Sequence, residues 1–427
     1  MTLVDKASAF PKSVQPGIPM LGPKPFGWTR GPLSKHLVEY QRPIKMEDDT
    51  EYRLVTVKRS RGGVIERERL KGRDIAVKSQ YLLQAGDFLI SKRQIVHGAC
   101  GLVPVELDGS IASGEYSVLR GKPTVDLQFL SYLAHSIYFQ QTCFHSSIGV
   151  HVEKMIFKLD RWLEWDFDMP PIAEQRKIAE ILSTWDRAIA LQEKLVANAR
   201  AQKKSLMQQI LSGKKRLPGF QGEWARTTLG DVFDFKNGLN GDKSLYGSGT
   251  KFVNVMDVFR GSSLRHADIA GEMTVSASQL SEFGLKRGDV LFNRTSETED
   301  EIALSTVYLD SKPAVFGGFV IRARPKDSSI LPEYSAYGFQ SQPIRRELIR
   351  LGQGAIRSNI GQVDLMTVPI SIPSIAEQRS IAEVLSSMDK AIIAQEQLIG
   401  KARTEKKALM QQLLTGKRRV KILEEVA

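Results

Sequence analysis

Apolar residues recur at alternating steps of four and three in two segments of the chain. The positions are Ile178, Leu182, Trp185, Ile189, Gln192, Val196, Ala199, Lys203, Leu206 and Ile210 in the first segment, and Ile381, Leu385, Met388, Ile392, Gln395, Ile399, Ala402, Lys406, Leu409 and Leu413 in the second. A period of 3.5 residues sustained over four or more heptads is typical of a left-handed coiled coil. The pattern therefore predicts two long helices, each of about 40 residues and roughly 60 Å in length.

The two segments are also close copies of each other. Residues 170–216 and 373–419 are identical at 29 of 47 aligned positions. Each copy begins with a proline and reaches a glycine, Gly213 or Gly416, that is followed by basic residues. These are common signals for the start and the end of a helix. Matching seams within one chain favour an intramolecular, antiparallel helix pair about a pseudo-twofold axis.

Two polar positions interrupt each apolar seam at the same places. They are Gln192 and Lys203 in the first copy and Gln395 and Lys406 in the second. Buried polar residues in a coiled coil lower its stability but fix register and partner. Such residues can equally lie at the solvent-exposed edge of a broader helix–helix contact, and the sequence leaves both interpretations open.

The stretches outside the helices predict mixed α/β domains. Short β-branched and aromatic runs bounded by Gly, Asp and Asn predict strands, and longer patterns towards the end of each stretch predict helices. The strands are expected at Tyr52–Lys58, Asp87–Ile90, Val290–Phe292 and Phe319–Arg322, and the helices at Leu127–Gln141 and Pro332–Leu351. The fold class is therefore α+β, with largely irregular sheets.

Weaker matches indicate that the whole chain is one duplicated unit. Trp28-x-Arg-x-x-Leu33 matches Trp224-x-Arg-x-x-Leu229, and Gly86-Asp87 matches Gly288-Asp289. The helices have stayed alike, whereas the globular parts have diverged until only scattered positions match. A segment that binds the same partner in both halves can keep its sequence, whereas segments that bind different partners must differ. The chain is therefore predicted to be an adaptor in which two similar helices carry two globular domains that recognise different targets.

Four parts follow from this organisation. We expect a first globular domain at 1–169, a first helical region at 170–216, a second globular domain at 217–372, and a second helical region with a C-terminal tail at 373–427. At 427 residues the chain is long enough for each domain to bury its own core.

Composition is that of an ordinary folded protein. Hydrophobic residues make up 42% and charged residues 25% of the chain. No run of about 18 apolar residues is present, and prolines break the N-terminal segment where a signal peptide would need an apolar core. We therefore expect a cytoplasmic protein without a membrane span. Cys100 and Cys143 are predicted to be buried small hydrophobes.

The net charge of +12 lies mostly on the two copies, with +6 in residues 170–216 and +3 in residues 373–427. A basic balance suits a nucleic-acid partner, but only if the charge is segregated onto one face. Docking of a protein partner or nearby phosphates could each explain the charge on the helices.

The repeated motif resembles a known family. Pro170-Pro-Ile-Ala-Glu-Gln-Arg176 with Ile178-Ala-Glu180, and Pro373-Ser-Ile-Ala-Glu-Gln-Arg379 with Ile381-Ala-Glu383, resemble the conserved helical regions of specificity subunits of type I restriction–modification systems. The resemblance covers essentially the whole chain. It implies two target-recognition domains, each reading one half of a bipartite site in double-stranded DNA, and two helices that pair antiparallel.

The same resemblance implies partners and excludes a cofactor of the chain's own. The helices of the family separate the readers and dock two methyltransferase (modification) subunits, and restriction/translocase subunits join the larger complex. Such a subunit is not catalytic. Modification would be adenine N6-methylation with S-adenosylmethionine bound by the partner.

The two domains look like different varieties of recognition domain. Gly86–Arg93 with His97–Pro104 is similar to one variety, and Gly288–Arg294 with Gly354–Ile360 is similar to another. The first domain has Cys143-Phe-His-Ser-Ser-Ile148 where the last of these motifs would stand. Unlike varieties imply an asymmetric site with two different half-sites.

Candidate DNA contacts lie in four tracts. They are Lys58, Arg59 and Arg61; Lys92, Arg93, Gln94 and His97; Asn293 and Arg294; and Arg357, Ser358 and Asn359. Arg, Lys, Asn and Gln read base edges, and basic or hydroxyl groups hold phosphates. The tracts follow strands or contain glycines, so loops there would present them to a groove. Each tract also has a plain interpretation as a solvated strand end, a surface hairpin, a structural turn or a hydrogen-bonded loop histidine.

The sequence gives little support to an enzymatic function. Asp168-Met-Pro-Pro171 lacks the spacing and the aromatic residue of an adenine methyltransferase strand end, and Gly247–Lys251 does not fit a phosphate-binding loop. The six histidines form no metal-ligand spacing with either cysteine. The alternative to a DNA-specificity subunit is a protein-interaction scaffold that dimerises through the coiled coil. Binding that weakens steeply as salt rises would favour DNA.

Overall fold

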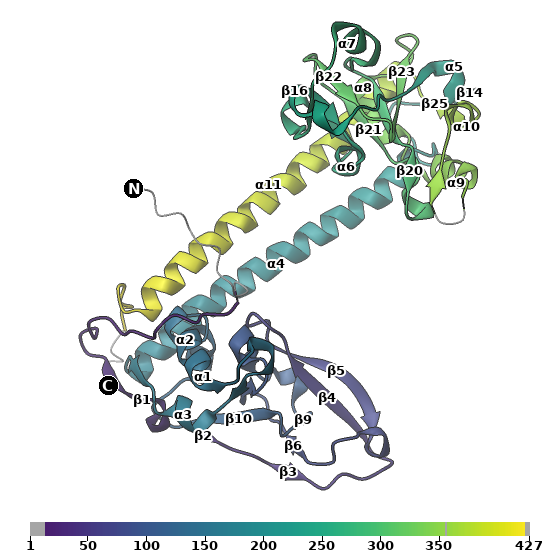
Figure 1. The fold of residues 1–427 in the computed structure, drawn as a ribbon. Helices are drawn as coiled ribbons and strands as arrows, with labels where there is room; N and C mark the ends of the chain where they lie inside the picture. Colours follow the sequence, from purple (N-terminus) through teal and green to yellow (C-terminus); the bar gives the residue numbers. More distant parts are fainter. Residues whose placement is uncertain (1–12, 355–356, 423–427) are drawn as a thin grey trace, which may run out of the picture. The chain divides into compact units, whose positions relative to one another are not determined.

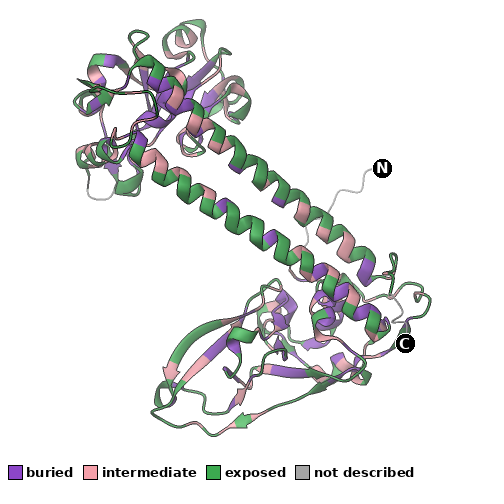
Figure 2. Cartoon of the chain, turned by 180° about the vertical axis from the view of Figure 1, so that it is seen from behind, coloured by how far each residue is buried: buried purple, intermediate pink, exposed green. Residues whose placement is uncertain are grey.

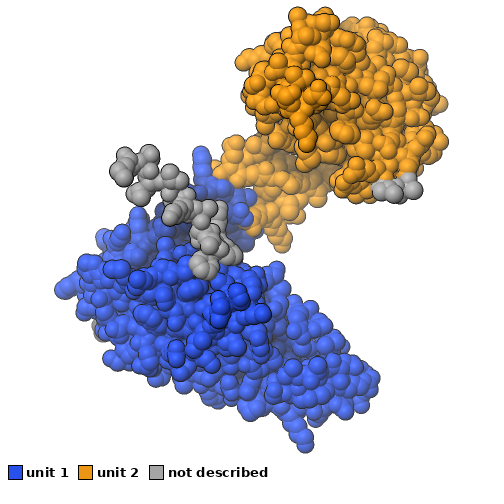
Figure 3. All heavy atoms as spheres, viewed as in Figure 1, with its two compact units in different colours: residues 1–191, 399–427 blue, residues 192–398 orange. Residues whose placement is uncertain are grey.

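The computed structural model describes residues 13–354 and 357–422, and the chain divides into two compact units (Figure 3). Unit 1 comprises Met1–Leu191 with Ile399–Ala427, and unit 2 comprises Gln192–Leu398. Residues 1–12 of the N-terminal segment, and Ala355 with Ile356 of the motif at 354–360, lie outside the described residues. None of the described helices is long and apolar enough to cross a membrane.

Unit 1 is built on two sheets, one antiparallel and one mixed with a single parallel pair, β4 with β9 (Figure 1). One has the strand order β2-β10-β7-β8 and the other β3-β6-β9-β4-β5, while β1 pairs with β13 and β11 with β12. The bounds are β1 Thr29–Pro32, β2 Leu37–Glu39, β3 Pro43–Ile44, β4 Glu51–Val57, β5 Val64–Lys71, β6 Gln80–Leu82, β7 Phe88–Ser91, β8 Cys100–Leu102, β9 Ile111–Ser113, β10 Tyr116–Gly121, β11 Ser147–Ile148, β12 Ile156–Phe157 and β13 Asp166–Met169. The strands predicted at 52–58 and 87–90 are confirmed as β4 and β7, each with its ends shifted by one residue.

The helices of unit 1 outside the repeated segments are short. They are α1 Leu127–Leu133, α2 Ile137–His145 and α3 Leu159–Leu163, with single 3-10 turns at η1 Leu33–Lys35, η2 Gly72–Asp74, η3 Ile95–His97, η4 Val105–Leu107 and η5 Val152–Lys154. The single pattern predicted over 127–141 is two helices, because the Ser136 hydroxyl accepts a hydrogen bond from the Phe139 amide and so caps a new helix. Phe129 and Trp162 lie fully buried beneath them.

Unit 2 has different sheets. One has the order β15-β23-β19-β21-β17 and another β18-β16-β22, while β14 pairs with β25 and β20 with β24. The bounds are β14 Ala225–Thr228, β15 Phe233–Asn237, β16 Tyr246–Val253, β17 Ser263–Leu264, β18 Glu272–Met273, β19 Val290–Asn293, β20 Thr295–Ser296, β21 Ser305–Tyr308, β22 Ala314–Phe316, β23 Val320–Pro325, β24 Ser358–Asn359 and β25 Pro369–Ile372. The strands predicted at 290–292 and 319–322 are confirmed as β19 and β23.

The helices of unit 2 outside the repeated segments are also short. They are α5 Leu229–Val232, α6 Val255–Phe259, α7 Ala277–Phe283, α8 Pro332–Gly338, α9 Gln342–Leu351 and α10 Gln362–Met366, with 3-10 turns at η6 Lys243–Leu245, η7 His266–Asp268 and η8 Glu299–Glu301. The pattern predicted over 332–351 is again two helices. Ser341 is extended, with ψ 144°, and Pro343 in the first turn of α9 fits a helix start.

Each globular part opens on a strand that pairs with the strand just before a long helix. In unit 1, β1 runs antiparallel to β13 with Thr29 opposite Met169. In unit 2, β14 runs antiparallel to β25 with Ala225 opposite Ile372. Each Trp-x-Arg match seen in the sequence begins one residue before its strand, at Trp28 and Trp224. The prolines after β13 and β25 end those strands and lead into the long helices.

Both long helices form as predicted. The first is α4 Ile172–Ile210 and the second is α11 Ile375–Leu414. The glycines just beyond them, Gly213 and Gly416, have φ of 70° and 66°, the left-handed conformation that ends many helices. Within unit 1, Leu182 and Leu413 belong to one buried cluster, and within unit 2, Ile210 and Leu385 do the same. Buried positions on both long helices are purple in Figure 2.

The helices run antiparallel within each unit. In unit 2, Arg200 pairs with Glu396 and Lys203 with Asp389. The residue numbers of the partners on α11 therefore decrease as those on α4 increase. In unit 1, Lys406 pairs in the same sense with Asp186. The predicted α+β fold with an antiparallel helix pair and an internal repeat is confirmed.

Candidate nucleic-acid interface

Two of the candidate tracts come together in unit 1. The turn between β4 and β5 is a hairpin, with the Lys58 amide bonded to the Gly63 carbonyl at 2.9 Å. The amides of Ser60 and Arg61 donate to the carbonyls of His97 and Gly98, both at 2.7 Å. These bonds join the basic turn to the η3 segment, although the two tracts are more than 30 residues apart in sequence.

The turn holds an unusual backbone conformation. Ser60 and Arg61 have φ of 56° and 60°, which costs non-glycine residues of order 1 kcal/mol or more each. Arg61 packs against Gly98, and its Nη1 atom is buried without a hydrogen-bond partner among the described residues. Burial lowers the pKa of the Arg61 guanidinium. Arg61 is therefore largely turned inward, unlike Lys58 and Arg59 of the same tract, which are exposed as a surface turn requires.

Arg59, one of the exposed residues of the turn, is the centre of a polar cluster. Its Nε donates to Gln94 Oε1 at 2.7 Å and its Nη2 to Glu153 Oε2 at 2.8 Å. The other Glu153 oxygen lies 3.0 Å from His97 Nε2. Arg59, Gln94, His97 and Glu153 thus connect the β4–β5 turn, the β7–η3 segment and η5.

The remaining residues of these tracts differ in exposure. Lys58 is exposed at the hairpin. Lys92 is half-buried and donates to the Gly114 carbonyl at 2.9 Å, while exposed Arg93 forms an ion pair with Glu115. Lys58 and Arg93 are the cations of this region most open to a ligand.

His97 lies under the surface rather than on it. Its side chain is 1% exposed, and Nδ1 is 3.4 Å from the Ser13 hydroxyl. Burial and the nearby Arg59 charge lower the pKa of His97, which favours the neutral ring. A direct contact of His97 with DNA would need a rearrangement, and its burial agrees better with the plain interpretation, a hydrogen-bonded loop histidine.

The two tracts of unit 2 also meet. Strand β20 pairs with β24, the Ile360 amide donates to the Arg294 carbonyl at 3.0 Å, and the Thr295 hydroxyl donates to Asn359 Oδ1 at 3.0 Å. Exposed Arg357 lies 3.6 Å from the carboxylate of exposed Glu297. Arg294 and Arg357 therefore share one exposed region of unit 2.

Asn293 and Ser358 depart from the expected exposure. Asn293 is fully buried in β19, where its amide nitrogen donates to the Thr295 carbonyl at 3.3 Å, and Ser358 is buried in β24. The reason for Asn293 is that β19 lies between β21 and β23 in the sheet, so its last residue remains covered. These two side chains support the loop, and Arg294, Arg357 and Asn359 are the exposed members.

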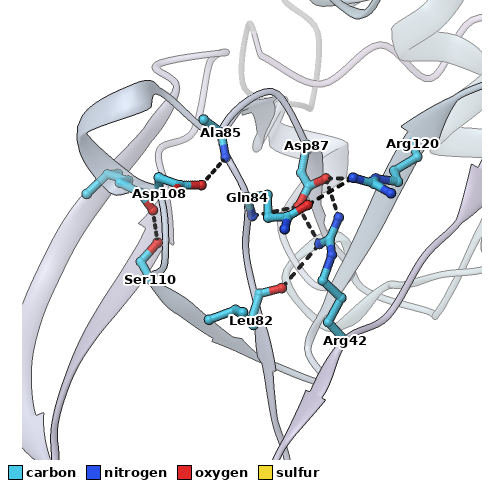
Figure 4. Close-up of polar contacts among 9 residues, drawn as sticks. Arg42, Leu82, Gln84, Ala85, Asp87, Asp108, Ser110 and Arg120 are labelled. Carbon is cyan, nitrogen blue, oxygen red and sulfur yellow. Dashed lines mark hydrogen bonds and ion pairs between the residues drawn. The ribbon is translucent and has the colours of Figure 1, made fainter.

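The aspartates of the two matching pairs, Gly86-Asp87 and Gly288-Asp289, have a structural role that the sequence alone did not indicate. Asp87 is buried, accepts from the Gln84 amide at 2.8 Å, and receives both Nη1 and Nη2 of Arg42 at 2.7 and 3.1 Å (Figure 4). Asp289 accepts from the Lys286 amide at 2.7 Å and pairs with Arg324 in unit 2. Each aspartate fixes the turn before the strand that leads into the candidate tracts.

The repeated motif on the helices makes the same buried contacts in both units. Glu174 accepts two hydrogen bonds from Arg419, both at 2.7 Å, and one from the Trp28 indole at 3.2 Å. Glu377 accepts the equivalent pair from Arg216, at 2.6 and 2.5 Å, and one from an indole at 3.0 Å. These are well-satisfied buried carboxylates of the kind that hold a domain to a helix.

The glutamine of the motif ties each helix to the chain before it. Gln175 donates to the Thr124 and Pro170 carbonyls at 3.0 and 2.8 Å. Gln378 donates to the Ser329 and Pro373 carbonyls at 2.8 and 3.0 Å. The Ala-Glu-Gln sequence therefore recurs because each copy seats its own globular domain in the same way.

No group of metal ligands occurs among the described residues. Cys100 and Cys143 are both buried, which confirms their assignment as small hydrophobes, and burial raises the pKa of the Cys100 thiol to about 12. The cation-bearing loops are thus the described features best suited to an external ligand, and that ligand would be anionic.

Comparison with known proteins agrees with this arrangement. The family described as type I restriction modification DNA specificity domain matches residues 43–199 and again residues 221–401. Two relatives from Methanocaldococcus jannaschii, the type I restriction enzyme MjaVIII specificity subunit and the putative type I restriction enzyme MjaX specificity subunit, are each 26% identical to the chain. The matches cover 64% and 59% of this chain and span 65% and 59% of those relatives.

Solved structures share the fold over nearly the whole chain. A chain solved in work on complex assembly and conformational transition of the type I R-M system has a TM-score of 0.61 and 20% identity over 93% of this chain and 100% of its own. The HsdS subunit from Thermoanaerobacter tengcongensis has a TM-score of 0.52 and 20% identity over 93% of this chain and 99% of its own. An S subunit from M. genitalium has a TM-score of 0.53 and 12% identity over 95% and 100%. At these identities the likeness concerns the fold.

Proposed function

Since the chain belongs to the type I restriction–modification DNA specificity family and carries its domain twice, we propose that it is the DNA-recognition subunit of a type I restriction–modification complex. In this proposal residues 1–169 and 217–372 each read one half of an asymmetric bipartite site in double-stranded DNA. Residues 170–216 and 373–427 hold the readers and dock the partners. The chain itself catalyses no step.

One observation carries the proposal: the contacts between helix and globular domain are the same in both units, whereas the loops that hold the candidate tracts differ. Glu174 and Glu377 make the same arginine and indole contacts in their units. The candidate tracts differ, since unit 1 presents a hairpin over a 3-10 turn and unit 2 presents the short β20–β24 ribbon. Two unlike loops on equivalent supports are what reading two different half-sites requires.

Exposed apolar residues on the two helices support the proposed partners. Leu195 and Leu398 occupy equivalent positions of the two copies, and their side chains are 49% and 54% exposed. The same exposed apolar residue at both positions suits one protein partner bound twice. We propose two methyltransferase subunits as that partner, with S-adenosylmethionine bound by them, and restriction/translocase subunits in the larger complex.

The test is to co-express the chain with the methyltransferase encoded beside it and to map methylated adenines across a genome. We expect one two-part motif with different halves and an unread spacer of fixed length. Methylation without such a motif, or a motif that persists when the chain is omitted, would overturn the proposal.

A further inference from the structure

Among the described residues of unit 1, Glu153 is the exposed carboxylate that contacts both Arg59 and His97. It was not singled out by the sequence, because it lies 94 residues from Arg59 and 56 from His97 and only the fold brings them together. Its side chain is 59% exposed. An exposed carboxylate beside DNA is repelled by the phosphates, so its presence among candidate DNA contacts calls for a compensating gain.

The geometry around Glu153 is that of a held acceptor. Arg59 Nη2 donates to Oε2 at 2.8 Å, and Arg59 is itself fixed by Gln94 Oε1 at 2.7 Å. On the other side, buried His97 places Nε2 at 3.0 Å from Oε1, within ion-pair distance but without the angle of a hydrogen bond. Each carboxylate oxygen has further lone pairs, and the exposed side of the group is open to solvent.

A carboxylate can only accept hydrogen bonds. In the major groove the donors are exocyclic amino groups, N4 of cytosine and N6 of adenine. Lysine and arginine cannot recognise these donors, and a carboxylate discriminates against bases that present a carbonyl there.

We propose that Glu153 reads an exocyclic amino group in the major groove of the first half-site, with Arg59 and His97 as positioning residues. This inference rests on the proposed function. Arg59 offsets the charge of Glu153 next to the phosphates, and His97 supports the carboxylate from beneath. Replacing Glu153 should therefore relax one base position and leave the second half-site unchanged.

The experiment uses the full chain in complex with its methyltransferase and a library of duplexes randomised in both half-sites. Glu153→Gln is compared with Glu66→Gln, which removes an exposed carboxylate that pairs with Arg69 on β5 of the same unit. We expect Glu153→Gln to lose about 10-fold discrimination at one position of the first half-site, where the wild type selects cytosine or adenine on one strand. Glu66→Gln should retain the wild-type motif.

Duplexes with cytosine, N4-methylcytosine, adenine or N6-methyladenine at that position identify the amino group, because each methylated base blocks the exocyclic donor. His97→Gln should relax the same position and add little to Glu153→Gln in the double variant, which a merely structural loss of stability would not reproduce. A wild-type complex without any sequence preference would defeat the proposed function itself. If the wild-type complex has a motif and the Glu153→Gln variant keeps that motif unchanged, this inference alone is overturned. The same holds if the variant binds every sequence more tightly without a change in motif.

Discussion

Lys203 and Asp389 form an ion pair inside unit 2, with Nζ and Oδ1 2.6 Å apart, at a position where the heptad pattern calls for an apolar residue. The Tyr337 hydroxyl donates to the other oxygen of Asp389 at 2.9 Å. In unit 1, Lys406 and a tyrosine hydroxyl make the same contacts with Asp186. The polar interruption is thus a three-residue bridge between the two helices and the globular domain, made once per unit.

Replacing the central carboxylate of the bridge should destabilise unit 2. Asp389→Ala leaves a half-buried ammonium and a phenol hydroxyl without their acceptor, so we expect the free energy of unfolding to fall by about 1–3 kcal/mol. Urea unfolding measures the change. Glu396→Ala, which breaks the more exposed pair with Arg200, should cost about 0.5 kcal/mol. Equal losses for the two variants would contradict the bridge.

Acid should destabilise unit 1 through its buried histidines. Burial lowers the pKa of His36 and of His97 below the ordinary 6.5, so both are held neutral in the folded chain. Because the unfolded chain binds more protons, their stabilising contribution is complete above about pH 6.5 and is lost as the pH falls towards the folded pKa. Thermal unfolding between pH 7 and 5 should show this decline. His36→Gln should reduce the decline, because it removes one of the two contributing groups, and His151→Gln, at an exposed site, should leave it unchanged.

Arg294 should contribute to DNA binding from unit 2. Arg294→Ala in the complex is expected to weaken binding several-fold. A lost phosphate contact would reduce the slope of log K against log salt by about 0.9, whereas a lost base contact would relax one position of the second half-site. Arg350→Ala, which removes an exposed arginine paired with Glu347 on α9, is the control. Indistinguishable effects of the two substitutions would remove Arg294 from the interface.

Binding that resists salt would instead favour the protein-interaction scaffold. Wild-type complex and duplex should dissociate steeply between 50 and 200 mM salt if phosphates supply the affinity, by about 10³-fold or more for six or more contacts. A scaffold held by apolar contacts would lose little over that range.

The helix surfaces should dock one methyltransferase each. Leu195→Asp and Leu398→Asp should each lower the number of bound methyltransferase subunits from two to one, and the double variant should bind none stably. Both side chains are exposed, so folding should be preserved. Val105→Asp, at an exposed apolar site in unit 1, is the matched control. Mass measurement of the purified complexes gives the stoichiometry, and two subunits retained by the double variant would refute this docking surface.

The long helices could be predicted closely because the apolar period repeats over many turns and a glycine marks each end. Strands β4, β7, β19 and β23 were also visible as β-branched runs. The breaks at Ser136 and Ser341 were missed because a single capping hydroxyl or proline outweighs the apolar pattern around it. These are local signals, and a closer reading of serine and proline positions would have found them.

The candidate site was less predictable because exposure depends on neighbours. Asn293 ends a strand, yet β21 and β23 cover it on both sides. Arg61 follows a basic tract, yet a left-handed φ turns it against Gly98. Glu153 carries no local signal at all. Residue type indicated candidate tracts, while the fold decided which side chains of each tract reach the surface.

The central claim is that two independent readers share one frame, and a domain exchange tests it most directly. Residues 1–169 are replaced by the recognition domain of a different family member, with Arg419, the partner of Glu174, kept in place, and methylated adenines are mapped with the same methyltransferase. We predict that one half of the bipartite motif changes while the other half stays the same. A change in both halves, or in neither, would contradict two separate readers on a constant support.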